Sequence, residues 1–286
     1  MVEIQRILCP TDFSALSRRS LEAAVALARW YRTEITVLHV RDCGPAGEAA
    51  GPAADPREDL NRFAEVAVAE GVPTRVVLRE GHPVQEILSE AERIDAGLIV
   101  LGTHGRGGFE RWALGSVSDK VLRKASCPVL TIPHHPEAAP RPVKCVLCPV
   151  DFSATSLQAL DFAGSLAREA DARLTLLHVV EGLPDHEPRI NLHFNVAEYR
   201  LYVLRAARER LAQVLPDEAR GWCEPESLVA CGKPYREILR VCREIQADLL
   251  VLGVHGWGAL DPRLFGSTAH HVVRESSCPV LTIRGK

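Results

Sequence analysis

The feature that most constrains this chain is an internal repeat that covers almost its whole length. ILCPTDFSALS (7–17) recurs as VLCPVDFSATS (146–156), and SCPVLTI stands at both 126–132 and 277–283. The offset between the copies is 139 residues at the start and 151 from Gly81 onward, so the second copy is 12 residues longer in its middle. The repeat predicts two related domains, in line with 286 residues at roughly 100–200 residues per domain. Other matched segments are ITVLHV (35–40) with LTLLHV (174–179), GHPVQEIL (81–88) with GKPYREIL (232–239), and AGLIVLGTHG (96–105) with ADLLVLGVHG (247–256).

The boundary between the copies is a proline-rich segment, PHHPEAAPRP (133–142). It has four prolines and no apolar period, which is typical of a semi-rigid linker. We therefore expect one domain at 1–133, a linker at 134–142 and a second domain at 143–286. The adjacent histidines of this linker, His134 and His135, are candidate metal ligands, but solvated side chains are the simpler interpretation.

Composition narrows the class of partner. The chain has 37 acidic and 34 basic residues, a net charge of −3, so nothing in its charge favours nucleic acid or an anionic membrane. The N-terminus lacks a basic segment followed by an apolar run, and no apolar stretch reaches 18 residues. We therefore expect neither a signal peptide nor a membrane span, and a cytoplasmic location.

The nine cysteines form no compact disulfide framework. Cys145 and Cys148 make a C-x-x-C motif, but in a run typical of a strand, where positions i and i+3 point to opposite faces. Buried strand cysteines are therefore a better interpretation than a metal or redox pair. The repeat also aligns Cys9 with Cys148 and Cys127 with Cys278, which indicates repeated core positions.

Within each copy, short β-branched runs alternate with segments of helical period. The run 96–102 is apolar throughout, as in a strand that is covered on both faces. Alternating strands and helices predict two tandem, doubly wound α/β domains, each with a five-stranded parallel sheet and right-handed crossovers. In the first copy we expect strands at 4–9, 34–40, 73–80, 96–102 and 127–132, helices at 14–31, 57–70, 83–94 and 116–125, and a loop at 41–56.

Sheets of this kind bind ligands beyond the carboxyl ends of their strands, where the strand order reverses. Asp12 follows the first strand, and Gly102 ends the fourth. If these two strands are neighbours, both residues face one crevice.

One glycine frame follows the fourth strand in both copies: GTHGRGGFERWALGS (102–116) and GVHGWGALDPRLFGS (253–267). Glycine tolerates positive φ and lets a ligand approach the backbone closely. The closing Gly115-Ser116 opens a helix whose first N–H groups lack partners and whose dipole favours negative charge. The frame thus predicts a phosphate site, although Ser116 and Asp119 can instead form a capping box. It is neither a Walker P-loop nor a dinucleotide fingerprint.

With PTDFS (10–14) and PVDFS (149–153) ahead of these frames, the chain resembles the universal stress protein family. The resemblance extends over nearly the whole chain and is to the tandem two-domain form. The spacing G-2x-G-9x-G-[ST] is that of the ATP-binding branch. The resemblance implies a Rossmann-like, adenine nucleotide alpha hydrolase-like fold in each copy, with ATP as the ligand.

The resemblance also implies which residues hold the nucleotide. The turn after the first strand contacts adenine and ribose, and its aspartate suits a ribose hydroxyl or, equally, caps the next helix. The end of the second strand is an apolar wall for adenine or ordinary core, and the glycine frame holds ribose and phosphates. The implied nucleotide-binding residues are Pro10, Thr11, Asp12, Val40, Gly102, His104, Gly105, Arg106, Gly115, Ser116 and Val117 in the first copy, and Pro149, Val150, Asp151, Val179, Gly253, His255, Gly256, Gly266, Ser267 and Thr268 in the second.

The copies differ in charge within the frame. Arg106 and Arg111 of the first copy are replaced by Trp257 and Pro262, and Arg263 compensates in part. Because charge-assisted hydrogen bonds are about twice as strong as neutral ones, we expect both sites to bind, the second more weakly or with different selectivity.

His104 and His255 occupy the same position of the frame. Histidine titrates near neutral pH and can act as a general base, but no nucleophile, carboxylate pair or metal triad accompanies these two. Turn packing or ligand contact is the preferred interpretation, and no catalytic or metal-binding residue is assigned.

Three functions remain open. The leading one is an ATP-binding regulator in the stress response, whose occupancy changes the surface seen by a protein partner that the sequence does not name. The alternatives are a slow Mg²⁺-dependent ATPase or phosphotransferase, and a small-molecule or metal carrier with one degenerate nucleotide site. The apolar strands at 127–132 and 278–283 are expected sheet edges, which invite pairing. Because the resemblance implies that this edge builds dimers, the two copies are expected to pair as an intramolecular pseudo-dimer, with a further homodimer left open.

Overall fold

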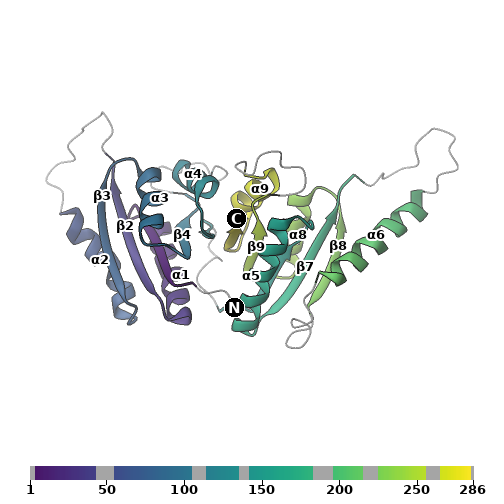
Figure 1. The fold of residues 1–286 in the computed structure, drawn as a ribbon, viewed down its shortest axis with the longest axis horizontal. Coiled ribbons are helices and arrows are strands. Elements are labelled where there is room, and N and C mark those ends of the chain that lie inside the picture. Colours follow the sequence, from purple (N-terminus) through teal and green to yellow (C-terminus); the bar gives the residue numbers. More distant parts are fainter. Residues whose placement is uncertain are drawn as a thin grey trace.

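A computed structural model describes residues 4–42, 55–104, 114–134, 142–182, 196–214, 225–255 and 265–284. In each repeat, strands and helices alternate along the chain (Figure 1). The elements of the first repeat are β1 (Arg6–Thr11), α1 (Ala15–Tyr31), β2 (Glu34–Arg41), α2 (Pro56–Ala69), β3 (Thr74–Glu80), α3 (Pro83–Arg93), β4 (Leu98–Gly102), α4 (Ser116–Lys124) and β5 (Val129–Ile132). Those of the second are β6 (Cys145–Pro149), α5 (Ala154–Ala170), β7 (Arg173–Val180), α6 (Val196–Gln213), β8 (Glu226–Cys231), α8 (Pro234–Glu244), β9 (Leu249–Gly253), α9 (Ser267–Glu275) and β10 (Val280–Ile283).

The ten strands form one sheet in the order β3-β2-β1-β4-β5-β10-β9-β6-β7-β8. Every pair within a repeat is parallel, and β5 and β10 join the repeats as an antiparallel pair. At this seam Thr131 Oγ1 donates to the Val280 carbonyl at 3.2 Å, and Thr282 Oγ1 donates to the Val129 carbonyl at 3.1 Å. The predicted fold class is confirmed, and so is the pairing of the two apolar edges within one chain. Because each repeat covers the other's edge, neither strand exposes unpaired backbone groups there.

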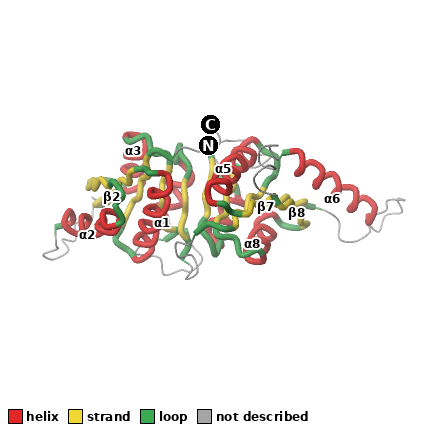
Figure 2. The backbone as a smooth tube through the Cα atoms, turned by 90° about the horizontal axis from the view of Figure 1, so that it is seen from below, coloured by secondary structure: helices red, strands yellow, loops and turns green. Residues whose placement is uncertain are grey.

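Helices flank the strands of both repeats (Figure 2). Two hydrophobic cores lie on opposite faces of the sheet. One is built by α1, α2, α5 and α6, and the other by α3, α4, α8 and α9. Leu8 of β1 and Ile99 of β4 are fully buried, which fits a strand covered on both sides. Each such side chain contributes about 1.5–3 kcal/mol by leaving water, and both cores continue across the seam.

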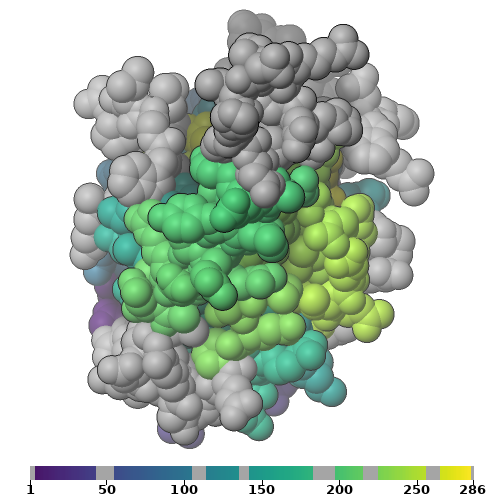
Figure 3. Space-filling model, turned by 90° about the vertical axis from the view of Figure 1, so that its right-hand side faces the viewer, coloured from purple at the N-terminus to yellow at the C-terminus, as the bar shows by residue number. Residues whose placement is uncertain are grey.

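The helix starts follow from local sequence. Ser14 and Ser153 cap α1 and α5 by accepting from the backbone N–H groups of Ser17 and Ser156. α3 and α8 each begin with proline, whose fixed φ suits a first turn. α6 packs on β7 and β8 and forms the outer surface at its end of the molecule (Figure 3). No helix among the described residues is long and apolar enough to cross a membrane.

The element boundaries agree with the sequence prediction within about two residues. The predicted C-x-x-C strand is β6, where both cysteines are buried. Most of the predicted loop at 41–56 lies outside the described residues, as does His135.

Candidate functional site

The candidate crevice lies at the carboxyl ends of the central strands of each repeat. β1 and β4 are neighbours, and the strand order runs outward from them in opposite directions, as the sequence analysis required. Asp12 follows β1, Gly102 ends β4, and α4 begins at Ser116. The same relation holds for β6, β9 and α9 in the second repeat. In both repeats the topology therefore meets the condition that the prediction set, that the first and fourth strands are neighbours.

The turn after β1 carries a strained aromatic residue. Phe13 has φ of 64°, a left-handed conformation that costs a bulky side chain about 1–3 kcal/mol. Asp12 Oδ1 accepts from the Ser14 backbone N–H at 3.0 Å, and Ser14 itself caps α1. The expectation that Asp12 caps the helix is therefore wrong, because its carboxylate instead holds the turn together.

The second repeat repeats this turn. Phe152 has φ of 66°, and Asp151 Oδ1 accepts from the Ser153 N–H at 2.9 Å and from its hydroxyl at 2.6 Å. Ser153 is the cap of α5, so Asp151 is not. Because both repeats keep the same strained turn, we infer that the fold maintains the position of this aspartate.

Aromatic contacts support each strained turn. The Phe13 ring lies 4.4 Å from the ring of His39, whose Nδ1 is 2.8 Å from the Thr11 carbonyl oxygen. In the second repeat Phe152 lies 4.6 Å from His178, and the Arg210 guanidinium lies 4.1 Å above the Phe152 ring. The sequence analysis did not assign these residues. The signal was present, because D-F-S and L-H-V recur in both copies.

The glycines of the frame serve close packing. A Cβ at Gly102 would lie 2.6 Å from Leu16 Cγ, and one at Gly253 would lie 2.8 Å from the Thr155 carbonyl carbon. A Cβ at Gly266 would lie 2.8 Å from the Val254 carbonyl oxygen. None of these three has positive φ, and Gly115 has φ of −58°. The expectation of positive φ at Gly102 is therefore wrong, and at Gly102, Gly253 and Gly266 the missing Cβ lets helices and turns approach the end of the strand.

The start of α4 has no side-chain cap. Gly115 is the N-cap residue, no side chain caps the helix, and Ser116 is its exposed first residue. Asp119 Oδ2 accepts from Arg123 Nε at 2.9 Å, so the alternative of a Ser116–Asp119 capping box is wrong. α9 likewise begins after Gly266 without a side-chain cap. The first N–H groups of both helices therefore have no side-chain cap, and the helix dipole there favours an anion.

The other predicted site residues differ in how deeply they are buried. Thr11 and Val150 are buried, with exposed fractions of 7% and 2%, and Thr11 Oγ1 is 3.0 Å from both Ser17 Oγ and the Phe13 amide nitrogen. Both side chains are therefore largely shielded from solvent, and their assignment to the nucleotide site stays a prediction. Half-buried positions at the carboxyl edge are Pro10, Val40, Val117, Pro149, Val179 and Thr268.

A model of the universal stress protein family matches residues 3–133 and 142–284. The chain belongs to the universal stress protein family. It is 30% identical over 232 residues to the universal stress protein Rv2005c of Mycobacterium tuberculosis, covering 79% of this chain and 70% of that protein. It is 32% identical over 138 residues to the universal stress protein MJ0531 of Methanocaldococcus jannaschii, covering 45% and 81%.

Solved structures agree with the tandem arrangement. A universal stress protein from Archaeoglobus fulgidus DSM 4304 superimposes with a TM-score of 0.68 at 25% identity, covering 98% of each chain. One from Pseudomonas aeruginosa UCBPP-PA14 gives a TM-score of 0.70 at 20% identity over 98% of this chain and 92% of the other. This universal stress protein thus shares its two-repeat fold with relatives of similar length.

The two frame histidines of this universal stress protein differ in their surroundings. His104 Nδ1 is 2.9 Å from Thr103 Oγ1, and its ring meets that of His134 edge-on at 6.4 Å. His255 is buried, and its carbonyl accepts from Thr155 Oγ1 and from Ser153 Oγ. No group of three metal-ligating side chains occurs among the described residues. Both environments are consistent with turn packing.

The interior of the frame lies outside the described residues. This applies to Gly105, Arg106 and Gly256, and to the residues on which the predicted difference in affinity depends, Arg111, Trp257, Pro262 and Arg263. The ranking of the two sites stays a prediction.

Proposed function

We propose that each repeat of this universal stress protein binds an adenine nucleotide, ATP, and that occupancy regulates how the protein meets a partner in the stress response. The observation that carries the proposal is the uncapped start of α4 and α9, each next to an aspartate fixed by a strained turn at the strand-order reversal. A polyphosphate suits the helix start, and a carboxylate suits a pair of ribose hydroxyls.

The residues of the first repeat divide the nucleotide between them in this proposal. The backbone N–H groups at Ser116 and Val117 would bind phosphate oxygens, while Asp12 would accept from the ribose hydroxyls. Val40 would contact the base. Mg²⁺ would enter with the triphosphate. Hydrogen bonds to a charged group contribute about 1.5–3 kcal/mol each, so losing one such contact would weaken binding about 10- to 100-fold.

The test is a charge placed at the helix start. Ser116→Glu puts a carboxylate at the first position of α4, where it repels phosphate but stabilises the helix dipole by about 0.3–1 kcal/mol. We expect the ATP affinity of the first site to fall on the order of 10- to 100-fold in calorimetric titration, with folding retained. Ser116→Gln is the neutral control of the same size, and Ser267→Glu is the matched change in the second repeat.

Each result decides between sites and functions. Unchanged affinity and stoichiometry in both Glu variants would overturn the proposal. Ser116→Glu leaves the second site intact, and Ser267→Glu leaves the first. Weaker remaining ATP binding in Ser116→Glu than in Ser267→Glu would support the predicted ranking of the two sites. ADP formation that Asp12→Ala abolishes would instead support the ATPase function.

A further inference from the structure

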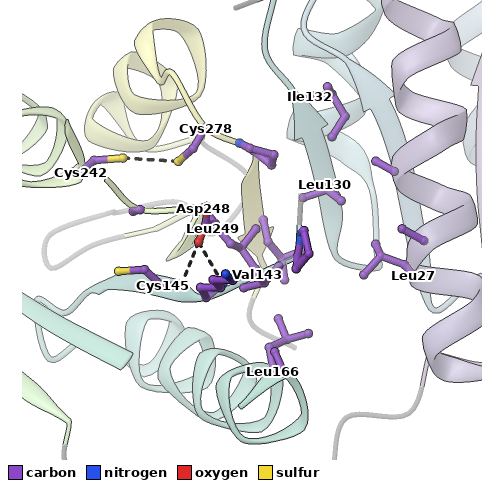
Figure 4. Close-up of a pocket in the computed structure, with 18 of the residues that line it drawn as sticks. Leu27, Leu130, Ile132, Val143, Cys145, Leu166, Cys242, Asp248, Leu249 and Cys278 are labelled. Carbon is purple, nitrogen blue, oxygen red and sulfur yellow. Dashed lines mark hydrogen bonds between the residues drawn. The ribbon is translucent and has the colours of Figure 1, made fainter. Parts of the chain in front are cut away.

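A second site is separate from the nucleotide crevices. A cavity of about 1230 Å³ lies between the repeats, with Leu27 of α1 and Leu130 of β5 on one side and Leu166 of α5 and Leu249 of β9 on the other (Figure 4). The described residues that line it include none of the candidate nucleotide-binding residues. Exposed side chains at its rim, Lys144, Arg243 and Gln246, show that it opens to solvent.

Two thiols meet in the wall of this cavity. Cys242 of α8 and Cys278, just before β10, point toward each other, and their Sγ atoms are 3.4 Å apart (Figure 4). A disulfide has an S–S distance of about 2.05 Å, so the two sulfur atoms must approach each other by roughly 1.4 Å for the bond to form. A shift of that size is within reach of side-chain rotation at a helix and a loop.

The surroundings make the two thiols unequal. A hydrogen bond from the Cys242 thiol lowers the pKa of Cys278, and the Ser276 hydroxyl, 3.5 Å from Cys278 Sγ, lowers it further against the opposing effect of burial. The same hydrogen bond and burial raise the pKa of Cys242. Cys278 therefore has the greater thiolate character, and the thiolate is the form of cysteine that reacts.

The first repeat lacks this arrangement. At the offset of 151 residues, Cys278 aligns with Cys127, but Cys242 aligns with Ala91 and Ser276 with Ala125. Burial raises the pKa of Cys127 to about 11. The sequence interpretation of Cys127 and Cys278 as equivalent core positions is therefore incomplete, because only the second repeat gives its cysteine a partner thiol.

We propose that Cys242 and Cys278 form a reversible disulfide on exposure to hydrogen peroxide. The Cys278 thiolate attacks one peroxide oxygen, the O–O bond breaks, and the hydroxide released takes a proton to leave as water. The Cys242 sulfur then attacks the resulting sulfenic acid, forming the S–S bond, while the S–O bond breaks and the second oxygen leaves as water with the Cys242 proton. Two thiols and one peroxide give one disulfide and two waters, and a thiol reductant reverses the reaction.

The bond would tie two elements of the second repeat at the seam. α8 carries Cys242, and Cys278 leads into β10, the strand that pairs with β5 of the first repeat. Oxidation would therefore restrain the segment that joins the two repeats. This role is independent of nucleotide binding, because neither thiol lies in a crevice.

The direct test needs no variant. The full-length protein is treated with hydrogen peroxide, its remaining thiols are alkylated, and its peptides are mapped by mass spectrometry without reduction. We expect a peptide that links Cys242 to Cys278, lighter than the two reduced peptides by two hydrogen atoms, and its loss after dithiothreitol. Absence of that peptide, or a link from Cys278 to Cys145 in its place, would overturn the proposal.

Two variants use the first repeat as a reference. Cys242→Ala removes the partner thiol, as Ala91 does in the first repeat, and we expect Cys278 to stop at a sulfenic acid that a dimedone probe captures. Ala91→Cys supplies the missing partner, and we expect a second cross-link to Cys127 that forms more slowly, since Ser276 has no counterpart there. Cys127→Ala is the control and should leave the Cys242–Cys278 link unchanged. Two readouts on Cys278 are compared between Cys242→Ala and the wild type: the rate at which this thiol becomes resistant to alkylation, and its labelling by dimedone. If neither readout differs, the assigned pair is wrong.

Discussion

The two repeats have the same strand order and the same strained turn, yet they hold these features with different side chains. Leu16 of the first repeat packs over Gly102, whereas its counterpart Thr155 brings the helix backbone against Gly253 and donates to the His255 carbonyl. Glu90, buried in the first repeat between two arginines, corresponds to Val241 in the second. The comparison teaches that the backbone geometry of the crevice is what both copies keep, while the contacts behind it have diverged.

The seam shows the same divergence at a single position. Asp119 of α4 and His270 of α9 are equivalent at the offset of 151 residues, and they face each other across the seam with His270 Nε2 3.5 Å from Asp119 Oδ1. In a symmetric pair of identical copies this position would meet itself, with two like charges in contact. Duplication within one chain allowed the two sides to become complementary.

The largest expected effect distinguishes the two glycines that end β4 and β9. In Gly253→Ala the new Cβ would meet backbone atoms of α5 at 2.8 and 2.9 Å, which cannot move alone, so we expect a loss of about 3 kcal/mol in the free energy of unfolding. In Gly102→Ala the two contacts under 3.0 Å would be to the Leu16 side chain, which can rotate, so about 1–2 kcal/mol is expected. Urea denaturation measures both.

The control for this pair is the double variant Gly102→Ala/Leu16→Ala, compared with Leu16→Ala alone. Removing the clashing side chain should abolish the cost of the alanine at 102. Equal losses in the two single glycine variants would show that helix packing against the strand ends is the same in both repeats.

The next effect concerns the buried carboxylate of the first repeat. Glu90 is 2% exposed and accepts from Arg93 Nε and Arg79 Nη2, both at 2.9 Å. We expect Glu90→Gln to cost about 1–3 kcal/mol in the free energy of unfolding, because the amide is buried without matching partners. Glu90→Val, which installs the second-repeat residue, is expected to cost less, since both arginines can turn to water.

The pH dependence of this effect has a definite sign. The hydrogen bond from Arg93 is the main reason that the pKa of Glu90 is lowered below 4.5. A carboxyl group with a lowered pKa stabilises the fold at pH values above 4.5 and loses that contribution as the pH falls through its folded-state pKa. The free energy of unfolding of the wild type, relative to that of Glu90→Val, should therefore decrease below pH 4.5. A constant difference between pH 6 and pH 3 would contradict the pairing.

The smallest expected effect is at the seam. Burial is the main reason that the pKa of His270 is lowered below 6.5, with Asp119 acting in the opposite direction. The folded protein thus keeps this imidazole neutral, so its contribution is complete above pH 6.5 and is lost as the pH falls below it. Between pH 7 and pH 5, we expect the Tm of His270→Gln to fall by about one degree less than that of the wild type. This corresponds to roughly a few tenths of a kcal/mol in the free energy of unfolding.

Asp119→Asn is the companion to this measurement. Because Asp119 favours the charged imidazole, its removal should make the decrease of Tm with falling pH steeper in the presence of His270 and leave it unchanged in His270→Gln. Identical pH profiles for Asp119→Asn and wild type would show that the two side chains do not interact.

The hydrophobic patterns of strands and helices, together with the internal repeat, predicted much of the fold. The continuous apolar run at 96–102 predicted a central strand, and β4 is one. The apolar sequences of β5 and β10 indicated edges that invite pairing, and the family resemblance implied that these edges pair with each other, as they do. For the site, position along the chain was sufficient to place Asp12 and the start of α4 at the same end of the sheet.

Local patterns failed where a residue's role depends on a distant neighbour. Glycine spacing suggested positive φ at Gly102, but the cause is Leu16 lying against it from α1. Spacing also suggested a capping box at Ser116, but helix α4 starts one residue earlier than that motif needs, and Asp119 is bound by Arg123.

By itself, then, the amino-acid order determined which segments form strands and helices, that there are two copies, and at which strand ends the candidate site residues lie, because hydrophobic period and chain direction are local properties. Only the tertiary structure decided that Cys242 meets Cys278, that Asp119 meets His270, and that a cavity lies between the repeats. These depend on how surfaces far apart in the chain pack together, and packing is set by shape and distance in three dimensions, which no short window of residues contains.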